Sequence, residues 1–440
     1  MAAATRCQDH RAATRFGGVR LVTAIVDPVS SGRSQTSETL DEFVERARAF
    51  LEAHAARKPD TAAEFVWGEG DDFVGIVEEG DPTGEAHLVA AARDWAATRF
   101  DAGFSWLDGP IELGGHGLDP EFVRAYRSLE SNYELPDQSI FTIGLGMVAP
   151  TILAHARPEI SARYLRPIQR GDLIACQLFS EPGAGSDLAA VATTAERDGD
   201  SWIVNGQKVW TSNAHHAGLG EIICRTDRDA PKHAGMTAFL VDMTAPGVEV
   251  RPLRQMTGGA GFNEVFFTDV RIPDDHRLGD VGQGWGVAMT TLMNERASIG
   301  SGMGLGRGPG PFERLIALTR AMGRHDDPIV RDRLAQLYIQ HKVLGYTGKR
   351  ALGAMQAGRL PGPEMSILKL AGTIHLLEVA DFAAAVLGPK LCADTGEWGT
   401  FAWTKLVCGA PGGRLGGGTD EILRNIIGER VLGLPREPKP

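Results

Sequence analysis

Two short segments carry residue types that could hold an anionic or aromatic ligand. The first, EPGAGSD at residues 181–187, can turn tightly and offer backbone N–H groups beside the hydroxyls of Ser180 and Ser186. The second, NGQKVWTSN at residues 205–213, places Trp210 next to two hydroxyl residues, which can cover an aromatic ring and hydrogen-bond its edge. Taken alone, such segments are more often an ordinary tight turn and a half-buried strand.

A run of three glycines, residues 416–418, leads directly into Thr419 and a helical pattern. Glycines have no side chain, so a ligand can approach the bare backbone of this loop. Thr419 suits the N-cap position of the next helix, and a purely structural cap would explain it equally well. The loop is therefore a candidate ligand contact, closed by a helix whose apolar residues recur at helical spacing: Ile422, Leu423, Ile426, Ile427 and Val431.

Glu295 is the candidate general base. It follows the largely apolar stretch VAMTTLM within residues 284–300, which have a helical pattern. Partial removal from water raises the pKa of a carboxylate toward the working pH, as proton abstraction near neutrality requires. On these residues alone, a surface glutamate paired with Arg296 or with a residue four positions later is favoured.

The elements that must position these segments change type twice along the chain. Helical patterns come first and begin with the capping-box spacing of Thr39 and Glu42. An alternating pattern follows, in which Asp198-Gly199 and Asn205-Gly206 are both predicted as hairpin turns, and helical patterns then return. The predicted fold is α+β and multidomain: an extension predicted to be disordered (1–36), an amino-terminal α-helical domain (37–172), a middle antiparallel β domain (173–288) and a carboxy-terminal helical bundle (289–440).

Composition restricts the class of protein. The chain has 440 residues and a formal net charge of -11, and phosphate backbones require clustered Lys and Arg, so a nucleic-acid-binding surface is not expected. The five cysteines show no paired or metal-finger spacing, which favours a cytoplasmic location, with Cys176 and Cys224 as packing residues. The most apolar window, residues 139–154, is too short and too polar to span a membrane.

Two further motifs complete no site. His215 and His216 are adjacent, but no carboxylate or cysteine lies at a suitable spacing, so loop histidines are predicted and no metal is expected. The glycine-rich residues 300–310 do not fit GxGxxG, and no strand precedes them. A close helix crossing or an unwound loop is predicted there.

Four segments in this order resemble the acyl-CoA dehydrogenase family: EPGAGSD, NGQKVWTSN, GWGVAMTTLMNERASIG and GGTDEILRNIIGERVLGLP. The resemblance covers about residues 39–434, and the α-β-α order matches the family's architecture. It implies a flavoprotein that uses FAD to oxidise an acyl-CoA thioester to trans-2-enoyl-CoA in fatty acid β-oxidation. It also implies a homodimer or homotetramer that passes electrons to an external acceptor, an electron-transferring flavoprotein.

The resemblance implies roles for individual residues around the cofactor. Ser180 would hydrogen-bond the edge of the flavin ring, Trp210 would flank the ring, and Ser212 would approach its N5 side. Glu421 would touch the FAD adenine of a neighbouring subunit, and Arg320 or Arg324 could reach its phosphates, but neither can be chosen. The other expected cofactor contacts are Gln177, Phe179, Gly185, Ser186, Thr211 and Thr419, and Ser186 would also touch the acyl-CoA.

The position of the base departs from the commonest family pattern. Many members carry a catalytic Glu immediately before the Gly-Thr of the glycine loop, where this chain has Gly417. A minority, including isovaleryl- and long-chain-type enzymes, take the base from a Glu-Arg pair in an earlier helix, which matches Glu295 and Arg296 here. Glu295 is therefore the expected base, Gly417 is expected to polarise the thioester through its backbone N–H, and Arg296 and Gly418 are expected to contact substrate.

Two other functions remain open on these residues. One is an oxidase or monooxygenase of the same fold that uses O₂. The other is a binding subunit of a hetero-oligomer whose partner supplies the chemistry, as the glycine at position 417 could indicate.

Overall fold

The structure, a computed structural model, describes residues 38–58, 66–74, 82–300, 311–356, 362–363 and 365–436. The predicted amino-terminal extension and residues 301–310 of the glycine-rich motif lie outside these ranges.

The first part of the described chain is helical, as predicted. The capping box is confirmed, since the Thr39 hydroxyl accepts a hydrogen bond from the backbone N–H of Glu42 and the Glu42 carboxylate bonds back to the Thr39 N–H. The first helix buries Phe43, Ala47 and Leu51 against an aromatic cluster. The helices are α1 (Leu40–His54), α2 (Pro82–Asp101), α3 (Pro120–Glu130), α4 (Ala149–His155) and α5 (Pro158–Arg170), with short turns η1 (Ile111–Leu113), η2 (Ser139–Phe141) and η3 (Gly144–Val148).

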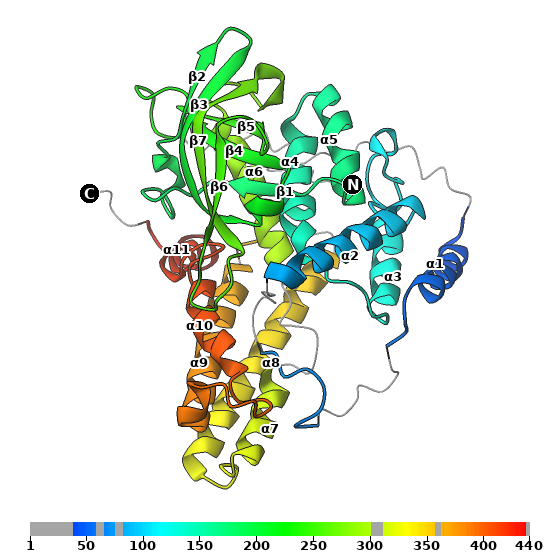
Figure 1. Cartoon of the computed structure of the whole chain (residues 1–440), viewed down its shortest axis with the longest axis vertical. Coiled ribbons are helices and arrows are strands. Elements are labelled where there is room, and N and C mark those ends of the chain that lie inside the picture. The colour runs from blue at the N-terminus through cyan, green and yellow to red at the C-terminus, as the bar shows by residue number, and fades with distance from the viewer. Residues whose placement is uncertain are drawn as a thin grey trace, which may run out of the picture. The chain divides into compact units, whose positions relative to one another are not determined.

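A single large sheet forms the middle part (Figure 1), which confirms the predicted β domain. Its strand order is β6-β7-β3-β2-β4-β5-β8, and β1 pairs with β4. Most neighbours are antiparallel, but β1 runs parallel to β4, so the sheet is mixed. The strands are β1 (Ala175–Leu178), β2 (Thr194–Asp198), β3 (Ser201–Ser212), β4 (Leu219–Arg225), β5 (Met236–Asp242), β6 (Val248–Leu253), β7 (Phe262–Pro273) and β8 (Arg277–Leu278), with turns η4 (Leu188–Ala190), η5 (Ala214–His216) and η6 (Asp274–His276).

The sheet corrects one of the two predicted hairpins. Asp198-Gly199 does join β2 to β3, and Gly199 has a φ of +61°. Asn205-Gly206, however, lies inside β3 at a β-bulge, where the pairing with β7 changes register. A Cβ on Gly206 would lie 2.7 Å from the Cα of Thr193, so glycine is required there by close backbone approach and not by a turn.

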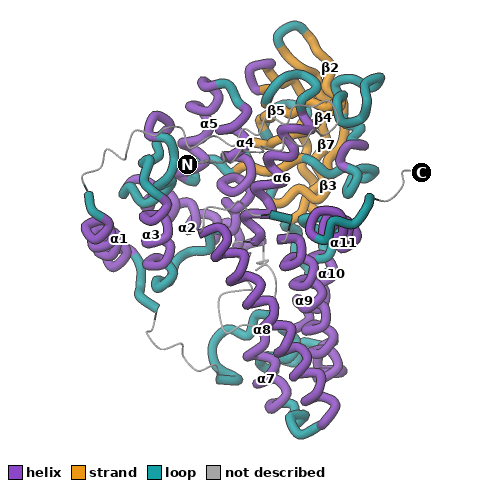
Figure 2. Tube along the Cα trace, turned by 180° about the vertical axis from the view of Figure 1, so that it is seen from behind, coloured by secondary structure: helices purple, strands orange, loops and turns teal. Residues whose placement is uncertain are grey.

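The last part of the described chain returns to helices, as predicted (Figure 2). The first of them, α6, packs across β4 and β5, and the expected domain boundary at residue 288 falls inside it. Figures 1 and 2 both show α11 between one end of the sheet and α10. The helices are α6 (Gly284–Gly300), α7 (Pro311–Ala321), α8 (Pro328–Gln356), α9 (Met365–Leu387), α10 (Trp403–Gly413) and α11 (Asp420–Ile426), with turns η7 (Gly388–Leu391) and η8 (Ile427–Val431).

Within the described ranges, one helical stretch is long and apolar enough to cross a membrane by length and composition, Met365–Leu391. It consists of α9 and η7, and it is not the window at residues 139–154 that looked most apolar in the sequence. Its later turns pack into a core shared with α7 and α10, where Val379, Phe382 and Ala383 are buried. Core helices of helical bundles pass the same test of length and composition.

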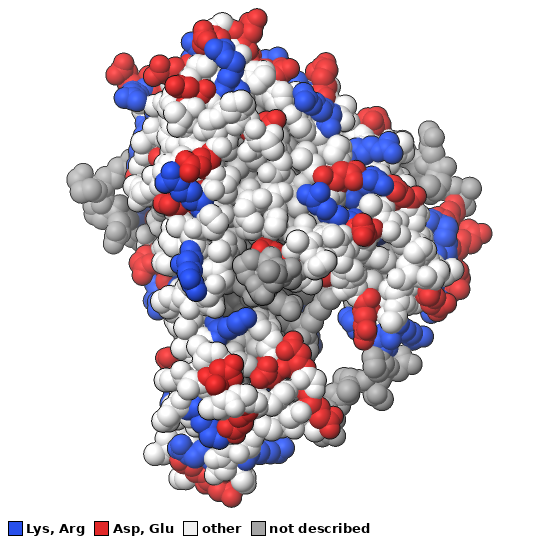
Figure 3. Space-filling model, in the orientation of Figure 1, with Lys and Arg blue, Asp and Glu red and all other residues white. Residues whose placement is uncertain are grey.

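Charged side chains of both signs alternate over the face shown in Figure 3. Neither sign forms an extended patch on that face.

Candidate active site

The EPGAGSD segment forms a tight turn directly after β1. Glu181 and Ala184 exchange backbone hydrogen bonds of 3.0 Å, so the Pro-Gly pair projects from the turn. Gly183 and Gly185 face open space, because a Cβ on either would meet no atom within 4 Å. A hollow of about 300 Å³ lies beside the turn. The turn therefore presents exposed backbone with room for a ligand.

A buried ion pair fixes this turn, and no local sequence pattern indicated it. Lys208 is fully buried, and its Nζ donates to the Glu181 carboxylate at 2.7 Å and to the carbonyls of Phe179 and Ile223. Three acceptors match the three donors of an ammonium group, so Lys208 is charged. Burial works to raise the pKa of Glu181, but Lys208 and the N–H groups of Ala192 and Thr193 outweigh it and hold that pKa below its usual value.

The end of β3 carries an unusual tryptophan. A register shift between Lys208 and Thr211 interrupts the pairing with β7, and Trp210 takes a φ of +60°. Its side chain is 61% exposed and meets the ring of Phe262 edge-on. The neighbouring Thr211 hydroxyl is buried and has no hydrogen-bond partner among the described residues. An exposed aromatic residue with a strained backbone, beside a buried hydroxyl that has no partner among the described residues, is typical of a ligand-binding site.

The fold brings the two segments together. The backbone N–H of Val209 donates to the carbonyl of Ser180 at 2.9 Å, so EPGAGSD and NGQKVWTSN lie side by side. Ser180 and Gln177 are half-buried beside this contact, whereas the Phe179 side chain is buried in the core. Ser212 is half-buried and Ser186 is exposed.

The glycine loop adopts a conformation that side chains disfavour. Gly417 and Gly418 have φ values of +67° and +97°, in the left-handed region. Thr419 caps α11, because its hydroxyl accepts a hydrogen bond of 3.3 Å from the N–H of Ile422, which confirms the predicted cap. The loop therefore requires glycine at these two positions for its backbone conformation, and the absence of side chains also leaves the backbone bare, as expected from the sequence.

Lys369 of α9 holds the glycine loop, and sequence reasoning missed it. Its Nζ donates to the carbonyl of Gly418 at 2.7 Å. Burial lowers the pKa of Lys369, and the negative charges of Asp420 and Glu295 oppose that shift. Glu295 itself is half-buried on α6. A lone lysine in the apolar helix SILKLAG was the signal that could have identified it.

The structure does not bring every expected residue into this region with a defined role. Glu421 is exposed on α11, and the side chain of Arg296 lies outside the described atoms. Arg324 forms an ion pair of 2.8 Å with Asp327, and Arg320 is exposed. The choice between the two arginines therefore stays open.

A second buried carboxyl is Glu221 of β4, whose hydrogen-bond partner Thr291 lies one helical turn before Glu295 on α6. The hydroxyl of Thr291 on α6 donates to its Oε1 at 2.6 Å and also contacts the hydroxyl of Thr151 at 2.9 Å. Burial raises the pKa of Glu221 to about 8. Glu221 is paired in register with Gln177 of β1, so a neutral acid lies beside the expected cofactor strand. Nothing in the local sequence marked it.

Comparisons with known proteins agree with this arrangement. Residues 176–270 match the family described as acyl-CoA dehydrogenase, middle domain, and residues 282–432 match acyl-CoA dehydrogenase, C-terminal domain. The acyl-CoA dehydrogenase IpdE1 of Mycobacterium tuberculosis is 37% identical over 377 residues, which cover 84% of this chain and 94% of that protein. FadE34 of the same organism is 42% identical over 288 residues, 66% of this chain and 39% of that protein.

Solved structures give the same result. The steroid acyl-CoA dehydrogenase Tcur3481-Tcur3483 superposes with a TM-score of 0.69 at 26% identity, covering 90% of this chain and 98% of that one. The ChsE4-ChsE5 complex from Mycobacterium tuberculosis superposes with a TM-score of 0.65 at 26% identity, covering 92% and 100%. Family members are FAD-dependent flavoproteins of lipid metabolism. The chain belongs to the acyl-CoA dehydrogenase family and is an acyl-CoA dehydrogenase.

Proposed function

We propose that this chain binds FAD and oxidises an acyl-CoA thioester to the trans-2-enoyl-CoA, with Glu295 as the base. The observation that carries the proposal is the glycine loop, which has no acid of its own and is held at the carbonyl of Gly418 by Lys369. Because Gly417 is held at positive φ, a catalytic glutamate at that position would be strained, whereas Glu295 needs no such conformation.

The residues present fit FAD. The unpartnered buried hydroxyl of Thr211 and the exposed Trp210 offer a hydrogen bond and an aromatic surface at one edge of the site. When bound, FAD supplies the hydride acceptor at its N5 atom. The residues proposed to hold FAD are Gln177, Phe179, Ser180, Gly185, Ser186, Trp210, Thr211, Ser212, Thr419 and Glu421.

The chain's own groups act on the substrate in three ways. Glu295 takes the proton from the α carbon. The N–H of Gly417 donates to the thioester oxygen as negative charge develops on it. Lys369 positions that donor by holding the carbonyl of Gly418. Ser186, Gly418 and Arg296 are the proposed substrate contacts.

Glu295→Gln tests the proposal. Purified wild-type protein is expected to carry FAD and to lose its flavin colour anaerobically with one of a panel of straight-chain, branched and steroid acyl-CoA thioesters, the last because a related structure is titled a steroid enzyme. Glu295→Gln should keep the FAD and slow bleaching by about 10²–10⁴-fold, the usual contribution of a general base. Glu196→Gln, which changes an exposed glutamate on β2, serves as the control.

The outcomes separate the parts of the proposal. Wild-type protein without FAD would overturn cofactor binding, and unchanged bleaching by Glu295→Gln would overturn the base. Electrons are proposed to pass to an electron-transferring flavoprotein. Rapid reoxidation by O₂, with peroxide release and no benefit from that acceptor, would instead show an oxidase.

A hetero-oligomer is the second candidate assembly beside a homodimer or homotetramer. The names of two related solved structures each give two different chains, Tcur3481-Tcur3483 and ChsE4-ChsE5. Expression of this chain alone decides between them, because a homomeric enzyme reduces its own flavin with substrate, whereas a subunit that needs a partner does not.

A further inference from the structure

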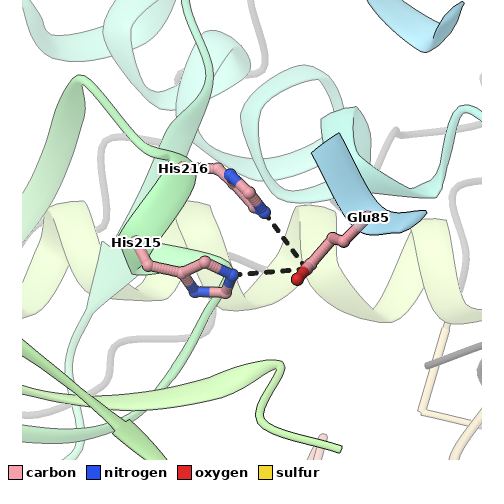
Figure 4. Close-up of side chains that lie close together, drawn as sticks. All are labelled: Glu85, His215 and His216. Atoms are coloured by element: carbon pink, nitrogen blue, oxygen red, sulfur yellow. Dashed lines mark hydrogen bonds and ion pairs between the residues drawn. The ribbon is translucent and has the colours of Figure 1, made fainter. Parts of the chain in front are cut away.

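Three side chains with metal-ligand atoms meet beside the end of β3 (Figure 4). Glu85 comes from α2, and His215 and His216 come from η5. Oε1 of Glu85 lies 3.3 Å from Nε2 of His215 and 3.1 Å from Nε2 of His216, and the three ligand atoms lie within 4.8 Å of one another. The sequence spacing offered the two histidines no third ligand; the fold supplies one from a distant helix.

The tautomer of His215 is set by its contact with Asn263, which is fully buried. The Asn263 side-chain amide donates to the carbonyls of Thr211 at 3.1 Å and Gly261 at 3.3 Å, and this fixes its orientation. Its Oδ1 therefore faces Nδ1 of His215 at 3.2 Å and can only accept, so Nδ1 carries a proton. In a neutral ring, Nε2 then points a lone pair at the Glu85 carboxylate.

Two lone pairs 3.3 Å apart repel unless a positive charge lies between them. Either a second proton on His215 or a bound cation can supply the missing charge. A cluster of two neutral imidazoles and a carboxylate therefore lacks a positive charge.

Its dimensions match a metal site. Zinc bonds to histidine nitrogen and carboxylate oxygen of about 2.0–2.1 Å, in tetrahedral geometry, place ligand atoms about 3.3 Å apart. The two distances to Glu85 are 3.1 and 3.3 Å. Metal-ligating histidines also commonly donate their other N–H to a fixed acceptor, which is what Asn263 provides. The three side chains are between 21% and 35% exposed, which leaves a side open to a water ligand.

We propose that Glu85, His215 and His216 bind one divalent transition-metal ion with the ligand preferences of Zn²⁺, with water in the remaining position. The site lies outside the proposed chemistry and does not depend on it. Because Glu85 lies on α2 and the histidines lie on η5, the ion would join α2 to the loop after β3. Asn263, which orients His215, also holds the backbone of Thr211.

The test uses the full-length, FAD-loaded protein after chelator treatment and removal of the chelator. Calorimetric titration with ZnCl₂ is expected to show one ion per chain, and Co²⁺ should give visible d–d absorption of a low-symmetry site. Glu85→Gln and His216→Ala should each weaken binding by more than the roughly 10–100-fold typical of losing an outer partner. His87→Ala, which removes an exposed histidine on the same helix, should bind as wild type does.

Thermal unfolding gives a second readout. Zn²⁺ should raise the midpoint of wild-type protein and of His87→Ala but not of the two ligand variants, and the metal-free midpoints should agree, because the changed side chains are partly exposed. Failure of wild-type protein to take up Zn²⁺, or equal uptake by all four proteins, would overturn the metal site and leave a proton on His215 as the charge.

Discussion

Two buried carboxyl groups, Glu181 in the turn after β1 and Glu221 on β4, have pKa values shifted in opposite directions. Glu181 is 8% exposed and Glu221 is completely buried, so both are removed from water. Glu181 receives a lysine and two backbone N–H groups, and its pKa falls. Glu221 receives a single hydroxyl, its Oε2 has no partner among the described residues, and its pKa rises to about 8. Partners, and not burial alone, decide the charge of a buried acid.

The difference corresponds to where each group lies. Glu181 begins the EPGAGSD turn. Its partner Lys208 also donates to the backbone carbonyls of Phe179 and Ile223, so the ion pair joins the turn to β4. Glu221 lies behind α6, where a neutral acid adds no charge near Glu295. A second carboxylate there would repel the ionised form of the proposed base, since like charges raise one another's pKa. One acid thus anchors the site, and the other stays neutral beside it.

The largest expected effect comes from removing the cation of the charged pair. Lys208→Met should lower the free energy of unfolding by about 3–5 kcal/mol, because it leaves the buried carboxylate of Glu181 without its positively charged partner. Lys232→Met is the matched control, since it breaks the exposed pair with Asp187 and should cost less than about 1 kcal/mol. Denaturant unfolding of the two variants measures both. Equal, small losses would show that Glu181 is not held as an ion in the folded protein.

Neither buried acid could have been assigned from the sequence, although much of the fold could. The caps at Thr39 and Thr419 depend on neighbours three residues away, and both predictions are confirmed. The same local rule failed at Asn205-Gly206, because a dipeptide that permits positive φ serves a bulge as well as a hairpin. Local chemistry predicts local structure only.

The site shows the same division. The segments EPGAGSD, NGQKVWTSN and GGGTDE were visible because each is contiguous in the chain. The side-chain contacts around them join residues far apart in the sequence. Lys208 contacts Glu181, Thr291 contacts Glu221 and Glu85 contacts His215 only after helices and strands have packed. Side-chain pairs across such separations follow from tertiary register, which a single sequence does not give.

The second prediction compares the two acids by pH. The pKa of Glu221 rises from the ordinary 4.5 to about 8 on folding, so between these values the folded state holds a proton that the unfolded state has lost. Glu221 therefore makes stability fall as pH rises through this window, by about 1.4 kcal/mol per pH unit. Glu221→Gln removes that slope, so its stability relative to wild type should improve by on the order of 2–3 kcal/mol from pH 5.5 to pH 7.5.

Glu181→Gln is the opposite case, because its pKa is lowered on folding and its stabilising contribution is lost as pH falls. Unfolding free energies of wild type and both variants at the two pH values provide the measurement. If the unfolding free energies of Glu221→Gln and wild type differ by the same amount at both pH values, the proposed contrast is wrong, since Glu221 would then ionise alike in the folded and unfolded states.

The smallest expected effect concerns the hydroxyl that holds the neutral acid. Thr291→Val should cost about 1–2 kcal/mol, since it removes the hydrogen bond to Glu221 and the contact with Thr151 while keeping the side-chain shape. The Thr291 hydrogen bond lowers the pKa of Glu221, so its loss should move the end of the pH-dependent window above about 8. Thr291→Ser keeps the hydroxyl and should keep the wild-type window. A window that does not move in Thr291→Val would mean that desolvation alone sets the charge of Glu221, and the contrast with Glu181 would then depend entirely on Lys208 and the two backbone donors.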